Sequence, residues 1–143
     1  MTAAPLCQAI YSAFQSAPPS PGGLVAPGAD DGEAADIRRT LRHRRWTAVP
    51  RSTPSTLRWA LAWLTCDARR HYLPLWLLAS IDEVNARSST LFHLTRIAEP
   101  AHRAELALYT DAERAAVADF LRWITAADPS EAERATSALL GWA

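Results

Sequence analysis

The apolar segment from Thr53 to Ile81, TPSTLRWALAWLTCDARRHYLPLWLLASI, constrains the fold of this chain more than any other stretch. Its residues recur at helical spacing and form two stripes: Leu57, Leu61 and Leu64 in one, and Trp59 and Trp63 in the other. A helix that is apolar on more than one face belongs inside a protein. We therefore expect a central, buried pair of Trp/Leu-rich helices that meet near Thr65, the second kinked at Pro74 and ending near Val84.

Helical periodicity predicts further helices on both sides of this pair. Residues 6–14 and 30–45 each carry an amphipathic stripe, and Thr110 and Glu113 form a capping box that starts a helix running to about Ala126. Asp128 and Pro129 start a last helix, which would bury Leu139 and Leu140 and end at Gly141.

Two segments lack a helical pattern. Residues 16–29 contain four prolines and three glycines and are predicted to be a loop. Residues 85–99 show no decisive period and fit a buried loop, a short strand or one helical turn. The expected fold is a single all-α domain over residues 1–143, with five or six helices packed around the central pair and no sheet.

The composition excludes several classes of protein. No apolar run is long enough to span a bilayer, and two cysteines cannot form a disulfide framework, so we expect a soluble cytoplasmic protein. All 15 basic residues are arginine, which together with abundant alanine suggests a bacterium with a GC-rich genome. Without lysine the chain cannot be a P-loop enzyme, a protein kinase or a Schiff-base enzyme. No glycine lies between Gly32 and Gly141, so that region offers no phosphate-binding loop.

Candidate catalytic and metal-binding residues are few. Asp67 and His71 share a helix face next to Cys66, but a metal site needs three or four ligands, and the other histidines show no ligand spacing. Cys66 and His71 diverge on a helix and have no third group to orient them as nucleophile and base. We therefore expect no catalytic residues, cofactor or metal, and regard an enzyme as the less favoured interpretation.

The basic stretch from Ile37 to Arg51 is the strongest candidate binding site. Arg38, Arg42 and Arg45 would share one helix face with Arg44 beside them, and Trp46 would either stack on a base or pack inward. Basic residues at a helix C-terminus also complement the helix dipole, which explains most of the pattern without a ligand. Because the net charge of the whole chain is zero, the basic stretch by itself does not indicate a nucleic-acid-binding protein.

A series of short motifs is spread along most of the chain. The motifs are IxxAF at Ile10–Phe14, a tryptophan at Trp46, YLPxxL at Tyr72–Leu77, LFxL at Leu91–Leu94 and ERxAVxxFL at Glu113–Leu121. In this order they resemble a bacterial family of unknown function, for which no activity or catalytic residue is established. The resemblance therefore implies a shared fold that includes Pro74, and it implies no function.

Three functions remain open from the sequence. The leading hypothesis is a non-enzymatic helical module that binds another protein, for example as an immunity or accessory factor. The alternative is a nucleic-acid-associated protein that uses Arg38, Arg42, Arg44 and Arg45. The third is a small enzyme whose acids or histidines converge only in the folded chain. The sequence does not indicate the oligomeric state.

Overall fold

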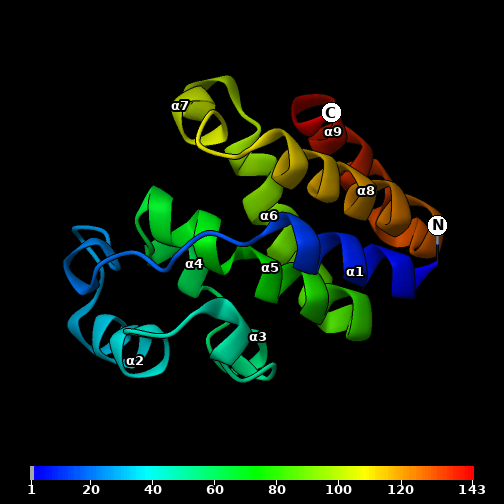
Figure 1. The fold of residues 1–143 in the computed structure, drawn as a ribbon. Coiled ribbons are helices and arrows are strands. Elements are labelled where there is room, and N and C mark those ends of the chain that lie inside the picture. Colours follow the sequence, from blue (N-terminus) through cyan, green and yellow to red (C-terminus); the bar gives the residue numbers. More distant parts are fainter. Residues whose placement is uncertain (1) are drawn as a thin grey trace.

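A computed structural model describes residues 2–143, whose regular secondary structure is all helical (Figure 1). The longer helices are α1 (Ala3–Ala13), α2 (Asp31–Leu41), α5 (Cys66–Asp82), α6 (Arg87–Ile97), α8 (Asp111–Ala127) and α9 (Ala132–Trp142). The single-turn helices are α3 (Thr53–Thr56), α4 (Ala60–Trp63) and α7 (Arg103–Leu106). The all-α class is confirmed, whereas the predicted count of five or six is wrong, because nine α-helices occur in the described residues. None of these helices is long and apolar enough to cross a membrane.

Helix α5 lies at the centre of the fold, as the apolar segment predicts. The Thr65 hydroxyl caps it by accepting a hydrogen bond from the Ala68 amide at 3.3 Å, and every residue from His71 to Ile81 is buried. The helix continues through Pro74, although proline has no N–H to donate there, and it ends at Asp82, two residues before the predicted end. Around it lie α1, α3, α4 and α6.

The predicted first member of the central pair is not one helix. The chain breaks between α3 and α4, where the Trp76 indole N–H donates to the Arg58 carbonyl at 3.1 Å. The break turns Trp59 outwards, so that 51% of it is exposed, and leaves Trp63 only partly buried. The prediction of two continuous stripes is therefore wrong, and the central element is the single helix α5.

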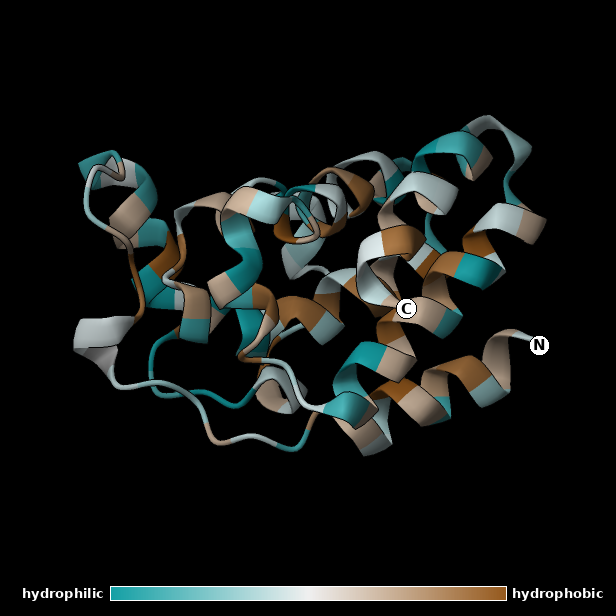
Figure 2. Ribbon diagram, turned by 90° about the horizontal axis from the view of Figure 1, so that it is seen from above, coloured by the Kyte–Doolittle hydropathy of each residue, from teal (hydrophilic) through white to brown (hydrophobic). Residues whose placement is uncertain are grey.

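Helices α1, α6, α8 and α9 form the other half of the molecule. Helix α1 packs on α8 and α5, and α9 packs on α8 and α6 (Figure 1). The predicted capping box is present, since the Thr110 hydroxyl accepts from the Glu113 amide and the Glu113 carboxylate accepts from the Thr110 amide. Figure 2 shows that hydrophobic residues lie between these helices and hydrophilic residues lie on their outer sides.

Three predictions at the C-terminal half need correction. Residues 85–99, predicted as a buried loop, a short strand or one helical turn, contain α6, an 11-residue helix. Gly141 does not end the last helix but lies inside it, where a Cβ atom would come within 2.5 Å of the Ala98 Cβ. Leu140 is 83% exposed rather than buried, and Trp142 occupies the core instead.

The proline-rich loop, residues 16–29, crosses the molecule and is hydrogen-bonded to the chain near the start of α5. Beyond α1, residues 14–30 contain one 3-10 turn, Pro21–Gly23. The Thr65 amide donates to the Leu24 carbonyl at 3.1 Å, and the Ala26 amide donates to the Trp63 carbonyl at 2.8 Å. These bonds form an isolated antiparallel bridge between Val25 and Leu64, and they fix the chain just before α2.

Candidate functional site

The predicted arginines lie at the C-terminal end of α2 and in the loop that follows it. Helix α2 ends at Leu41, four residues earlier than expected, so only Arg38 belongs to the helix proper. Arg42 is its C-cap, and Arg44 and Arg45 lie in the loop. The prediction that Arg38, Arg42 and Arg45 share one helix face is therefore wrong.

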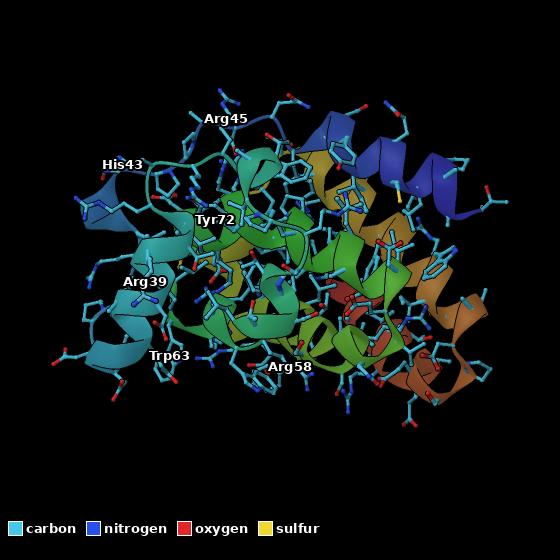
Figure 3. The ribbon with its side chains drawn as sticks, turned by 90° about the horizontal axis from the view of Figure 1, so that it is seen from below. Arg39, His43, Arg45, Arg58, Trp63 and Tyr72 are labelled. Atoms are coloured by element: carbon cyan, nitrogen blue, oxygen red, sulfur yellow. The ribbon has the colours of Figure 1, made fainter. Side chains whose placement is uncertain are left out.

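A shallow hollow of about 460 Å³ collects three of the four arginines. It is lined by Arg38, Arg42 and Arg44 together with Ala35, Arg39 and His43. We call the five basic side chains, Arg38, Arg39, Arg42, His43 and Arg44, the arginine surface. Arg45 does not line the hollow, and Figure 3 shows it well apart from Arg39. Arg39 and His43 complete the set, although the spacing analysis did not select them.

His43 produces the turn that separates Arg45 from the other arginines. Its φ of 62° places it in the left-handed region that frequently follows a helix C-cap. The Arg42 Nε–H donates to His43 Nε2 at 3.1 Å, which orients the Arg42 side chain. The turn carries the next residues back towards the core and leaves the basic side chains exposed.

Two residues of α5, Tyr72 and His71, form hydrogen bonds from the core to the loop that follows α2. The Tyr72 hydroxyl lies 2.8 Å from the Leu41 carbonyl oxygen and 2.7 Å from that of Arg44, so it satisfies the end of α2 (Figure 3). His71 Nε2 accepts from the Trp46 amide at 3.1 Å, while its Nδ1 lies 3.4 Å from the Ser16 hydroxyl. Burial, with a contribution from Arg45, lowers the pKa of His71 to about 4, so the ring is neutral near pH 7 and accepts at Nε2.

Trp46 anchors the loop rather than contacting a ligand. It is 3% exposed, and its indole N–H donates to the Phe14 carbonyl at 2.9 Å. The inward alternative for Trp46 is therefore correct, and it is not available to stack on a base. Burial also raises the pKa of Tyr72 to about 12, which keeps the hydroxyl protonated as a donor.

The arginine surface carries little compensating charge. Within residues 2–143, the one ion pair that involves this surface joins Arg39 to Asp36 at 2.9 Å, and both side chains are exposed. Exposed pairs of this kind contribute roughly 0–1 kcal/mol, so they do not hold the arginines in place. The surface thus presents guanidinium groups that are free to bind an anion.

The residues near Cys66 form a polar cluster. The Cys66 thiol donates to Glu105 Oε1 at 3.3 Å, and Arg69 pairs with the same oxygen. Burial and the Glu105 charge raise the pKa of Cys66, which disfavours the thiolate that a nucleophile requires. His71 is turned to Trp46 and Ser16, not to Cys66. In the described part of the chain, no three His, Cys, Asp or Glu side chains gather to hold a metal ion.

Residues 27–142 match the sequence profile of a family of unknown function, DUF6714. The chain belongs to this family. The matched residues include the whole arginine surface, together with the Tyr72 and His71 anchors, and leave out α1 and most of the proline-rich loop. No curated protein and no solved structure matches the chain.

Proposed function

We propose that this protein is a non-enzymatic binding module that docks an acidic patch of another protein on the arginine surface. The observation that carries the proposal is the lining of the hollow at the end of α2, where four arginines and His43 meet and, among the described residues, no carboxylate is part of the lining. Guanidinium groups bind carboxylates through paired, charge-assisted hydrogen bonds. Several such groups around one hollow suit a cluster of aspartate or glutamate side chains.

The anchoring of the loop favours binding. Tyr72, His71 and Trp46 fix the backbone that carries Arg42 and Arg44, so a partner does not have to order this segment when it binds. Fixing flexible groups costs free energy on association, and a preformed loop reduces that cost. The side chains of Arg38 and Arg44, which make no ion pair within residues 2–143, can still adjust to the partner.

The distribution of charge favours an acidic protein over a nucleic acid. Helix α2 begins with Asp30, Asp31 and Glu33, and its 11 residues span only about 16 Å. A long polyanion laid along this surface would soon meet those carboxylates. Residues 72–143 add 10 acidic residues against 6 arginines. A compact acidic patch can contact the hollow without meeting this repulsion.

A binding titration with matched variants tests the proposal. A labelled oligoglutamate peptide is titrated by fluorescence anisotropy with the wild type, with the double variant Arg42→Gln/Arg44→Gln and with the control Arg45→Gln/Arg58→Gln. The control removes the same charge from exposed arginines outside the hollow. We expect the double variant to bind at least about tenfold more weakly, a loss of about 1.4 kcal/mol, and the control to change affinity less than about threefold.

Duplex DNA of similar charge is titrated in parallel. We expect only weak binding of DNA at near-physiological salt. Tight, salt-sensitive DNA binding that the double variant abolishes would replace this proposal with the nucleic-acid alternative. Equal peptide affinity for the wild type and both variants would reject the arginine surface as a docking site.

A further inference from the structure

A second hollow, which shares no lining residue with the first, contains two exposed aromatic side chains. It has a volume of about 630 Å³ and is lined by residues of α6, α9 and the break before α4, principally Trp59, Phe92, Ser88, Thr95, Arg96 and Arg134. Small-molecule sites in proteins occupy roughly 300–1,000 Å³. The hollow therefore has the size of a ligand site.

The aromatic pair provides a surface for a flat ring. Trp59 and Phe92 are 51% and 45% exposed, and their rings meet edge to face with centroids 5.7 Å apart and an interplanar angle of 84°. The His93 ring also meets the Trp59 ring edge to face, with centroids 6.0 Å apart. Burial lowers the pKa of His93 to about 4, so this ring is uncharged near pH 7. Two perpendicular rings leave a face and an edge against which a third ring can pack.

The two arginines of the hollow differ in whether their guanidinium groups already contact other side chains. The Arg134 guanidinium donates to the Ser88 hydroxyl at 3.2 Å and lies 3.7 Å from the Glu131 carboxylate. Arg96 makes no ion pair with any residue between 2 and 143, although it lines the hollow. A free guanidinium beside an exposed aromatic pair is suited to bind the carboxylate of a ligand whose ring packs on that pair.

Glu99 restricts the charge of the ligand. It also lines the hollow, and it lies 3.6 Å from His102. A second negative charge on the ligand would be repelled by this carboxylate, whereas one carboxylate on Arg96 is compensated. Thr95 also lines the hollow, and its hydroxyl is buried without a hydrogen-bond partner in the described chain.

We propose that this hollow binds a small molecule in which a flat aromatic ring is joined to a single carboxylate. The ring packs against Trp59 and Phe92, and the carboxylate pairs with Arg96. This site is independent of the arginine surface, because the two hollows share no lining residue.

Three probes separate the contributions of ring and charge. Indoleacetate carries both features, indoleacetamide keeps the ring without the charge, and cyclohexylacetate keeps the charge without an aromatic ring. Each is titrated into the full chain, and binding is followed by amide and indole NMR shifts. We expect indoleacetate to bind at least tenfold more tightly than either of the other two probes, with the largest shift at the Trp59 indole.

Variants assign the two contributions to residues. Arg96→Gln should make indoleacetate and indoleacetamide bind equally, and Trp59→Ala should remove the preference for indoleacetate over cyclohexylacetate. Arg103→Gln, at an exposed arginine of α7, is the matched control and should keep both preferences. Phe92→Ala repeats the ring test if Trp59→Ala unfolds, as judged by its circular dichroism.

Two results would overturn the proposal. One is that none of the probes binds at millimolar concentration. The other is that binding occurs but both preferences survive in Arg96→Gln and in a folded ring variant. Neither result bears on the oligoglutamate titration, which uses other residues.

Discussion

At the scale of single residues, Gly141 illustrates a constraint that the sequence does not reveal. A glycine after a run of apolar residues near the end of a chain is typical of a helix terminus, which is why the sequence predicted one there. The structure instead uses the missing side chain to let α9 approach Ala98, the C-cap residue of α6. A close approach between two helices depends on their relative position, and a local pattern contains no information on it.

We expect Gly141→Ala to destabilise the protein. The new methyl group would meet the Ala98 Cβ at 2.5 Å and the Ala98 backbone at 3.1–3.2 Å. Overpacking of this kind costs roughly 1–3 kcal/mol and outweighs the higher helix propensity of alanine, which is worth about 1 kcal/mol. Urea unfolding measures the change. Gly22→Ala is the control, because no atom lies within 4 Å of its Cβ position. Equal stability of Gly141→Ala and the wild type would contradict the close packing of α9.

At the scale of elements, the sequence predicted helices correctly where residues close together in the sequence form the cap or the apolar face. The Thr110 and Glu113 capping box, the apolar stripe of α8 and the buried character of α5 all follow from residues close in sequence. The break between α3 and α4 does not, since it depends on Trp76 binding the Arg58 carbonyl from another helix. The early end of α2 has a similar cause, because the Tyr72 hydroxyl of α5 contacts the carbonyl of Leu41, the last residue of α2, and that of Arg44 in the loop.

The difference in burial between Trp63 and Leu77 determines what substitution of each should cost. Leu77 of α5 is fully buried, and Leu77→Ala should reduce the free energy of unfolding by about 2–5 kcal/mol. Trp63 is only partly buried, so Trp63→Ala should cost less than Leu77→Ala, although the tryptophan is the larger side chain. Urea melts of the two variants give the comparison. A greater loss for Trp63→Ala would mean that α4 is more central than α5.

At the scale of the whole molecule, the candidate site was predicted only in part. The sequence indicated the basic stretch and named Arg38, Arg42 and Arg44, which the fold brings to one hollow. It could not separate Arg45, because the turn at His43 is fixed by contacts of the following loop with α5 and with Phe14, the C-cap residue of α1. The aromatic hollow was missed, since exposure of Trp59 and Phe92 depends on how α6 meets the chain before α4.

Two buried histidines should make the stability of the whole fold depend on pH. Burial lowers the pKa of both His71 and His93 to about 4, with further lowering by Arg45 and Arg70 near His71 and by Arg69 and Arg96 near His93. Between pH about 4 and 6.5 the unfolded chain binds these protons and the folded chain does not, so acid favours unfolding.

We therefore expect the free energy of unfolding to fall as the pH drops from 6.5 to 4, by at most about 1.4 kcal/mol per pH unit for each histidine. Thermal melts across this range measure the slope, and His71→Gln should reduce it. His43→Asn removes an exposed histidine while keeping a residue that tolerates a positive φ, and it is the matched control for the loss of a histidine side chain. A flat profile between pH 4 and 6.5 would show that neither buried ring titrates with folding.

The most direct measurement of the proposed docking site is an NMR titration that observes the arginine Nε–H groups while oligoglutamate is added. We predict that the resonances of Arg38, Arg42 and Arg44 shift together and saturate at one peptide concentration, whereas those of Arg45 and Arg58 shift little. Equal shifts at all exposed arginines, or shifts that do not saturate, would contradict a docking site at the end of α2, because they would indicate only diffuse attraction between opposite charges.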